Sequence, residues 1–234
     1  MSRPTSLVLV RHGESAWITE GRFQGQGDPP LSDDGLRQAA AVGARLADPA
    51  RMPSVPVPER VPLAIWHSPL RRAAQTAQAI HEARAGDAPL RPLDALMELG
   101  QGEWVGLTHD EVRPRWPAQL AAWRDDRLRH HAPGGESLRD GQARVHAARE
   151  TMTVELPAGG GPAWSIAVAH DGILRLLLLD LLGIGLEHFW SFPLALASVT
   201  VLELDEGVVR LRAHNLDAHI MALGRSPVRP AGAL

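Results

Sequence analysis

Compact apolar segments recur along this chain, separated by longer stretches in which apolar and polar residues alternate with a helical spacing. The first segment, residues 6–10 (SLVLV), is apolar and rich in branched side chains, which predicts a short buried strand. Residues 63–66 and 165–169 have the same character and predict two more strands. Residues 90–96 predict a further strand or extended segment that ends near Glu98.

The stretches between these segments carry signals for helices. Ser32 is placed to cap a helix that contains LRQAAAVGARLA. Ser68 and Pro69 predict an N-cap and a first helical residue ahead of LRRAAQTAQAIHEARA. Two more helices are predicted, one over residues 142–155 and one, from an almost wholly apolar sequence, directly after Gly172.

Near the C-terminus the alternation of strands and helices ends. Residues 198–204 and 208–213 flank Asp205-Glu206-Gly207 and predict a β-hairpin. Residues 224–234 contain little material for a core, and we expect them to form a flexible tail. Residues 48–62 carry five prolines and predict an irregular surface connection.

Strands that alternate with helices predict an α/β fold. We expect a three-layer sandwich with a mostly parallel central sheet and helices on both faces. Residues 108–138 are rich in Trp and Arg and are broken by three prolines, so we interpret them as a small helical cap inserted over the sheet. Residues 1–223 are expected to form a single domain that includes this cap.

The polar residues at the strand ends indicate where a ligand would bind. In open α/β sheets, ligands bind beyond the carboxyl ends of the strands. His12 follows one predicted strand, His170 follows another, and Arg72 lies in the first helical turn after a third. A single histidine or arginine in such a place is usually structural or solvated. Two imidazoles, the guanidiniums of Arg11 and Arg72 and the carboxyl of Glu98 together predict one polar site.

Composition narrows the classes of protein to which this chain can belong. It has 234 residues, 44% of them hydrophobic, which is enough for the core of one domain, and a formal charge of -3 offers no basic field for nucleic acid. The longest apolar stretch, residues 173–186, is too short to cross a bilayer and contains Arg175 and Asp180. No apolar run near the N-terminus is long enough for a signal peptide. We therefore expect a cytoplasmic protein without nucleic-acid or membrane partners.

The residue types that the sequence lacks exclude several kinds of chemistry. There is no cysteine, so disulfides, thiolate metal sites and cysteine nucleophiles are excluded. There is no lysine either, which excludes a Schiff base and a P-loop lysine. Ser, Thr, His, Asp and Glu remain as covalent nucleophiles. No metal-ligand spacing such as HExxH occurs, and no metal or other cofactor is expected.

The sequence RHGES at residues 11–15 begins an ordered set of motifs. The others are RFQG (22–25), DPPLSDDGLRQA (28–39), SPLRRAAQTA (68–77), LMELGQGEWVGLT (96–108), PGGESLRDGQARV (133–145) and VAHDGILR (168–175). In this order they resemble the histidine phosphatase superfamily, in its phosphoglycerate-mutase-like branch. The resemblance covers nearly all of the chain up to Arg175 and implies phosphoryl transfer through a histidine.

Carried over residue by residue, the resemblance implies a role for eight side chains or backbone positions. His12 would be the nucleophile that becomes phosphohistidine, and Glu98 would be the proton donor to the leaving oxygen. The groups that would hold the transferring phosphoryl group are Arg11, Arg72 and His170, and those that would contact the substrate are Ser15, Gln24 and Gly25. Arg71 occupies a variable position and is interpreted as a solvated helix residue. Guanidinium forks suit this chemistry, because the transition state spreads negative charge over the phosphoryl oxygens.

Three positions depart from the pattern of the mutases. Ile18 replaces an amide that helps to bind phosphate, Gln26 stands where a Trp is common, and Val105 replaces an acidic residue. The lysine-rich lid of the true mutases is missing, whereas PGGES at residues 133–137 is typical of the phosphatase members. The sequence therefore favours a hydrolase acting on a small-molecule phosphate ester. The alternatives are a phosphoglycerate mutase that uses 2,3-bisphosphoglycerate and, from another class, a non-catalytic phospholigand-binding protein.

Several polar and aromatic residues outside these motifs have two readings. The cap residues His130, His131, Arg113, Arg115, Arg124 and Arg127 could line the mouth of the site, although a solvated cap surface is favoured. Trp66 and Trp104 are interpreted as packing residues. Glu136 either caps a helix or braces the site. The apolar segment 189–196 either packs internally or pairs two subunits, so a homodimer is one expectation.

Overall fold

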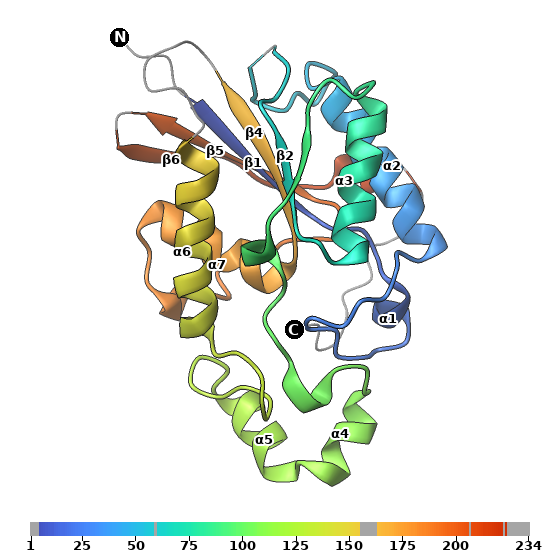
Figure 1. Ribbon diagram of the computed structural model, residues 1–234, viewed down its shortest axis with the longest axis vertical. Coiled ribbons are helices and arrows are strands. Elements are labelled where there is room, and N and C mark those ends of the chain that lie inside the picture. Colours follow the sequence, from blue (N-terminus) through green and yellow to red (C-terminus); the bar gives the residue numbers. More distant parts are fainter. Residues whose placement is uncertain (1–4, 59, 155–162, 206, 222, 224–234) are drawn as a thin grey trace.

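A six-stranded sheet forms the centre of the protein (Figure 1). The computed structural model describes residues 5–58, 60–154, 163–205, 207–221 and 223, so the expected tail at 224–234 lies outside the described residues. The strands are β1 (Thr5–Arg11), β2 (Ile65–His67), β3 (Leu90–Pro92), β4 (Trp164–Ala169), β5 (Val199–Asp205) and β6 (Val208–Leu216), in the order β3-β2-β4-β1-β5-β6. The first four strands in this order are parallel, and β5 and β6 form an antiparallel hairpin beside β1. The predicted mostly parallel sheet and C-terminal hairpin are confirmed.

Helices cover both faces of this sheet. The long helices are α2 (Asp33–Ala47), α3 (Arg71–Ala83), α6 (Leu138–Val154) and α7 (Asp171–Leu182), and the short ones are α1 (Ala16–Thr19), α8 (Ala218–Met221) and the 3-10 turns η1 (Asp94–Leu96), η2 (Gly102–Trp104) and η3 (Leu186–His188). Side chains alternate between the faces of a strand. Leu7 and Leu9 of β1 therefore pack towards α6 and α7, while Val8 and Val10 pack towards α2 and α3. Figure 1 shows the two helix pairs on opposite sides of the sheet, which confirms the three-layer sandwich.

Two helices begin at residues other than those predicted. The Ser32 cap of α2 is confirmed, since its hydroxyl accepts a hydrogen bond from the Gly35 amide at 3.0 Å. In contrast, α3 begins at Arg71, two residues after Pro69, because residues 68–70 remain extended and bring Ser68 towards the site. Helix α6 begins at Leu138 rather than at Gln142. Ser137 and Asp140 exchange hydrogen bonds there, from the Ser137 amide to the Asp140 carboxylate at 3.0 Å and from the Asp140 amide to the Ser137 hydroxyl at 3.2 Å.

The segment expected to form a cap contains α4 (His109–Arg115) and α5 (Pro117–Asp125), which extend beyond one end of the sheet (Figure 1). It has an apolar cluster of its own, which includes Phe23, Trp104, Leu120 and Trp123. Trp104 is fully buried in this cluster, so its interpretation as a packing residue is confirmed. None of the helices that the structure describes has the length and apolar character needed to span a bilayer.

Candidate active site

The ends of β1 and β4 bring two of the predicted site histidines together. The two strands pair in parallel, with Arg11 opposite Ala169, so His12 and His170 emerge side by side at the carboxyl edge of the sheet. Their ring centroids lie 5.0 Å apart. Both side chains are buried, with 2% of His12 and none of His170 exposed. Strand register therefore explains why residues so far apart in sequence share one site.

The local backbone orients the His12 ring and sets its tautomer. His12 Nδ1 lies 2.6 Å from the carbonyl oxygen of Gly13, which can only accept a hydrogen bond. Nδ1 therefore carries the proton, and Nε2 keeps its lone pair. Burial lowers the pKa of His12 well below its usual value, and the nearby charges of Arg72 and Arg11 lower it further. His12 is thus a neutral imidazole at neutral pH, which is the form that can attack phosphorus.

Gly13 has no β-carbon because the N-terminus of α2 crosses directly over it. A β-carbon on Gly13 would lie 2.6 Å from the carbonyl oxygen of Gly35. Beside it, Glu14 is buried and accepts a hydrogen bond from the Ser32 hydroxyl at 2.7 Å. The glycine and the glutamate of RHGES thus lock the turn after β1 against α2 and hold His12 in place.

His170 is held by Ser68, a residue that sequence reasoning assigned only to a helix cap. His170 Nε2 lies 2.8 Å from Ser68 Oγ, and that hydroxyl accepts a hydrogen bond from the Leu70 amide at 3.2 Å. The hydroxyl proton is then free to be donated to Nε2, which leaves the proton of His170 on Nδ1. Burial and the charges of Arg72, His12 and Arg11 lower the pKa of His170 well below its usual value, so this ring too is neutral.

Arg72 lies in the first turn of α3 and is fully buried. Its Nη1 donates to the carbonyl oxygen of Gly27 at 2.7 Å, and its Nη2 donates to that of Gly25 at 2.8 Å. Gly25 has a positive φ of 46°, a conformation that favours glycine and turns its carbonyl towards the guanidinium. Burial lowers the pKa of Arg72 to about 10, which still leaves it charged at neutral pH. The loop thus fixes this cation in the site.

Arg11 is held by a buried ion-pair chain that was not predicted. Its Nη1 donates to the carbonyl oxygen of Leu194 at 2.6 Å and lies 3.4 Å from Asp171 Oδ1. The second oxygen of Asp171 lies 3.1 Å from Arg175 Nε, one turn further along α7. Asp171 therefore joins Arg11 of the site to Arg175. The sequence signal was present in VAHDGILR, but nothing in it showed which cation the aspartate would meet.

Glu98 reaches the site from the segment after η1. Its Oε1 accepts hydrogen bonds from the Leu99 amide at 2.9 Å and the Ile173 amide at 3.3 Å, and its Oε2 accepts one from the Gly172 amide at 3.3 Å. Burial is the largest influence on the Glu98 carboxyl and raises its pKa, and the charge of Asp171 raises it further, although these hydrogen bonds and Arg72 oppose the shift. A carboxyl with a raised pKa is suited to give and take a proton near neutral pH.

The site contains buried hydrogen-bond donors that have nothing to bind. Arg11 Nε, Arg72 Nε and His170 Nδ1 are buried, and none has a hydrogen-bond partner among the residues that the structure describes. A buried donor left in this way costs about 1–3 kcal/mol. Three of them converge beside His12 with two positive charges. This arrangement fits a ligand that supplies several negatively charged acceptor oxygens, such as a phosphoryl group.

The three expected substrate contacts differ in what the structure shows. The Gly25 carbonyl binds Arg72, as described above. Ser15 is fully buried and caps α1, accepting from the Ile18 amide at 3.3 Å, and its hydroxyl donates to Gln24 Oε1 at 2.5 Å. The structure corrects the role expected for Ser15, because its hydroxyl is already engaged and can reach a substrate only through Gln24. Gln24 itself remains a predicted substrate contact.

The positions that depart from the mutase pattern are also accounted for. Ile18 is buried in α1. The Gln26 amide donates to the Glu98 carbonyl oxygen and to Glu136 Oε2, both at 3.2 Å. Glu136 also accepts from Arg144 Nη2 at 2.7 Å and from the Gly100 amide at 2.7 Å. Of the two roles considered for Glu136, bracing the segment that carries Glu98 is the one the structure supports.

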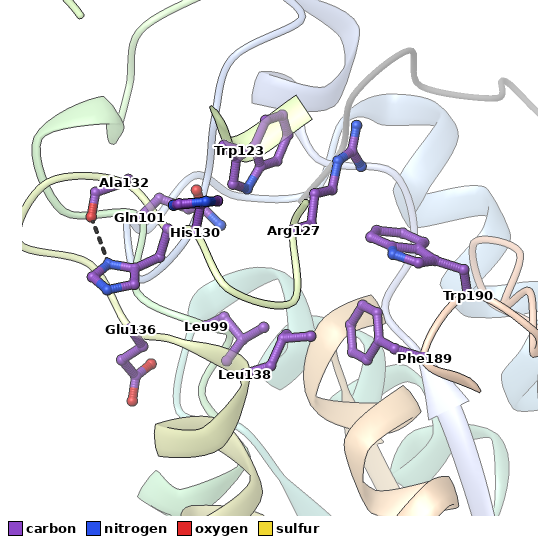
Figure 2. A pocket seen from close by; sticks show the side chains of 11 residues that line it. Leu99, Gln101, Trp123, Arg127, His130, Ala132, Glu136, Leu138, Phe189 and Trp190 are labelled. Carbon is purple, nitrogen blue, oxygen red and sulfur yellow. Dashed lines mark hydrogen bonds between the residues drawn. The ribbon is translucent and has the colours of Figure 1, made fainter. Parts of the chain in front are cut away.

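The ambiguous cap residues fall into two groups. Arg113, Arg115 and Arg124 are exposed, as the favoured interpretation required. In contrast, Arg127, His130 and His131 line a pocket that begins beside the site, together with residues of the 99–101 segment (Figure 2). Among the described residues, no group of three or more His, Asp or Glu is arranged to hold a metal ion.

Comparison with known proteins connects this site to a family. The sequence matches the histidine phosphatase superfamily (branch 1) over residues 7–217. It is 30% identical over 217 residues to phosphoserine phosphatase 1 of Hydrogenobacter thermophilus, covering 92% of this chain and 93% of that protein. It is 37% identical over 191 residues to glucosyl-3-phosphoglycerate phosphatase of Mycolicibacterium vanbaalenii, covering 80% and 78% of the two chains.

A mutase and a solved structure are also similar to this chain. A 2,3-bisphosphoglycerate-dependent phosphoglycerate mutase of Bartonella henselae is 34% identical over 202 residues, covering 81% of this chain and 87% of the mutase. The structure of Bacillus stearothermophilus YhfR superimposes with a TM-score of 0.77 at 30% identity and covers 92% of this chain and 99% of that one. Sequence and fold agree along almost the whole chain, which belongs to the histidine phosphatase superfamily.

Proposed function

We propose that this enzyme hydrolyses phosphate monoesters of small molecules in two steps, through a phosphohistidine on His12. The observation that carries the proposal is a neutral, buried imidazole with a free Nε2, set beside unpartnered N–H donors of Arg11, Arg72 and His170. Relatives named as phosphatases support hydrolysis as the outcome. The residue roles below are part of the proposal.

In the first step, His12 Nε2 attacks phosphorus and the bond from phosphorus to the ester oxygen breaks. The protonated carboxyl of Glu98 gives its proton to that oxygen, so a neutral alcohol leaves. The two guanidiniums and His170 Nδ1–H hold the phosphoryl oxygens, where the transition state concentrates its charge. The raised pKa of Glu98 increases the fraction that carries the required proton.

In the second step, water attacks the phosphorus of the phosphohistidine. The Glu98 carboxylate, left ionised by the first step, accepts a proton from that water. The bond between phosphorus and Nε2 breaks, inorganic phosphate leaves, and His12 returns to its neutral form. The cycle restores both residues and needs no cofactor.

Phosphoryl transfer between phosphoglycerates is the second candidate, because the relatives include phosphoglycerate mutases. The buried Ile18 and the lysine-free sequence favour hydrolysis over it. The two are separated by incubating the protein with 3-phosphoglycerate and 2,3-bisphosphoglycerate while following both isomers and free phosphate. Release of phosphate faster than interconversion is expected, and the reverse order would replace hydrolase with mutase. In that case, 2,3-bisphosphoglycerate would be the cofactor.

Trapping of the intermediate tests the proposed function directly. Brief incubation with a phosphate ester, followed by denaturation, should leave acid-labile phosphate on the protein, and His12→Ala should abolish both labelling and turnover. His146→Ala is a matched control, since that histidine is exposed on α6. Neither labelling nor turnover with a broad panel of esters would indicate a phospholigand-binding protein instead. A cytoplasmic location and a homodimer remain predictions from the sequence.

A further inference from the structure

A pocket beneath the cap begins where the proposed reacting groups end. Its wall includes Leu99 and Gln101, which directly follow Glu98 in the chain, and its outer part is formed by Trp123, Arg127 and Trp190 (Figure 2). Gln101 also packs against the loop that holds Arg72, because a β-carbon on Gly25 would lie 2.6 Å from the Gln101 amide nitrogen. The alcohol part of an ester is expected to extend from Glu98, its proton donor, into this pocket.

Arg127 is held in this pocket by aromatic rings rather than by a carboxylate. Its guanidinium carbon lies 4.1 Å from the ring centroid of Trp123 and 5.0 Å from that of Trp190, and Figure 2 shows Arg127 between the two labelled rings. No hydrogen bond or ion pair joins Arg127 to any residue that the structure describes. Stacking uses the faces of a guanidinium and leaves the N–H donors in its plane free. Arg127 is therefore a positioned cation without an anion.

The rest of the pocket does not neutralise this charge. Its carboxylate, Glu136, is already bound by Arg144 and by the Gly100 amide, both at 2.7 Å. His130 and His131 add imidazoles to the wall. Burial and the neighbouring charge of Arg124 lower the pKa of Arg127, which shows that positive charge is uncompensated there. An anionic ligand group would relieve this imbalance.

Two other contacts indicate that the pocket and the reacting site act on one ligand. The carbonyl oxygen of the Gln101 side chain is buried without a hydrogen-bond partner among the described residues, so it can accept a bond from a hydroxyl group on a ligand. Arg175 lies 5.2 Å from the Trp190 ring and pairs with Asp171, which in turn pairs with Arg11. The phosphate-holding arginine and the outer wall of the pocket thus belong to one connected set of side chains.

We propose that the preferred substrates carry a second acidic group on the alcohol part of the ester, and that Arg127 binds this group. The shared chemistry is an anion with planar or tetrahedral oxygens, either a carboxylate or a second phosphate. This inference rests on the proposed function, because it assigns the leaving-group side of the same site. Arg127 selects the substrate and takes no part in the transfer of the phosphoryl group.

Matched pairs of substrates test the proposal. The first pair is 3-phosphoglycerate and glycerol 3-phosphate, which differ by a carboxylate in place of a hydroxymethyl group. The second is propane-1,3-diol bisphosphate and the corresponding monophosphate, and p-nitrophenyl phosphate serves as an ester without a second anion. In at least one pair, the wild-type kcat/KM should be about 10- to 100-fold higher for the member with the second anion, as expected for a charge-assisted hydrogen bond.

Variants of Arg127 locate the origin of that preference. Arg127→Gln should reduce it to about twofold or less while leaving kcat/KM for p-nitrophenyl phosphate within about twofold, and Arg127→Lys, which keeps the charge but loses the planar fork, should retain part of it. Arg113→Gln removes the same charge from an exposed position on α4 and should change neither. Equal losses on all substrates would show a purely structural role. A wild-type enzyme without preference, or a preference that Arg127→Gln leaves intact, would overturn the proposal.

A binding measurement separates this inference from the proposed function. His12→Ala protein, titrated calorimetrically with each member of the two pairs, should bind the member with the second anion more tightly, and the double variant with Arg127→Gln should lose this difference. The result does not require turnover. If no ester is hydrolysed and no phosphate is trapped on His12, the proposed function fails, while the titration still decides whether Arg127 binds an anion.

Discussion

The phosphate end of the site and the pocket beneath the cap are both cationic, but they are built in opposite ways. At the phosphate end, Arg11 and Arg72 are buried, and each is anchored by hydrogen bonds to backbone carbonyls at 2.6–2.8 Å. In the pocket, Arg127 is only half-buried and is held by two indole rings. The first arrangement fixes direction, while the second fixes position and leaves the donors free to turn.

This difference separates chemistry from selection. Phosphoryl transfer needs donors at fixed places around the reacting phosphorus, and a sheet edge provides them because strand register is rigid. The alcohol part of the ester varies between substrates, and side chains from a helical cap can change without disturbing that edge. Substitutions at the sheet edge should therefore affect every ester, whereas those in the pocket should discriminate between esters.

The largest effect is expected at Glu98, and it should depend on the leaving group. Glu98→Gln removes the proton donor and should lower kcat for alkyl phosphates by about 10²–10⁴-fold. Aryl phosphates, whose leaving groups need little protonation, should lose much less. Steady-state rates on an alkyl and an aryl ester check this, and equal losses on both would contradict the role of Glu98 as an acid.

The pH dependence of the alkyl reaction tests the same residue. The acid form of Glu98 is the active one, so the rate should fall as the pH rises through its raised pKa. In Glu98→Gln this alkaline decrease should disappear, because no proton remains to be lost. A decrease that persists unchanged in the variant would assign it to another group.

The neighbouring arginines Arg71 and Arg72 offer a matched pair at the phosphate end. Arg72 is fully buried with an unpartnered Nε, whereas the Arg71 side chain is exposed. Arg72→Gln should lower kcat/KM by about 10²–10³-fold for all esters, the cost typical of one lost oxyanion donor. Arg71→Gln should stay within about twofold. An effect of Arg72→Gln confined to some esters would erase the contrast between the two ends of the site.

Ser68→Ala should have a smaller effect, because it acts through His170. Loss of the 2.8 Å contact frees the His170 ring and its tautomer, and we expect kcat to fall about tenfold. Ser137→Ala, which removes a hydroxyl at the start of α6, is a suitable control for general destabilisation. Restoration of the rate by Ser68→Thr would support a positioning role, and an unchanged rate in Ser68→Ala would exclude it.

The smallest effect is one that should be nearly absent. The reactive form of His12 is neutral and its pKa lies well below the usual value, so lowering the pH from 7 to about 5.5 should leave kcat for an aryl phosphate almost unchanged. A histidine with an ordinary pKa would become mostly protonated over this interval and the rate would fall severalfold. Such a fall would show that the site does not hold His12 neutral.

Much of this architecture is present in local sequence patterns. Residues 6–10 and 165–169 announce buried strands by their apolar composition, and both strands formed where they were predicted. Because ligand sites in such sheets lie beyond the carboxyl ends of the strands, the positions of His12, Arg72 and His170 followed from the order of the elements alone. The start of α3 was mistaken because Ser68-Pro69 resembles a helix cap, whereas Ser68 in fact contacts His170 across the sheet.

The sequence by itself determined the order of the elements, the family and the groups that can carry the chemistry, because these depend on local periodicity and on motifs. Only the tertiary structure decided how those groups are held: Ser68 against His170, Asp171 between Arg11 and Arg175, and Arg127 between two indoles. Each of these contacts joins side chains whose pairing depends on how helices, strands and loops pack together. A local pattern can place a cation on an element, but packing alone decides whether it meets a carboxylate, a ring or an empty pocket.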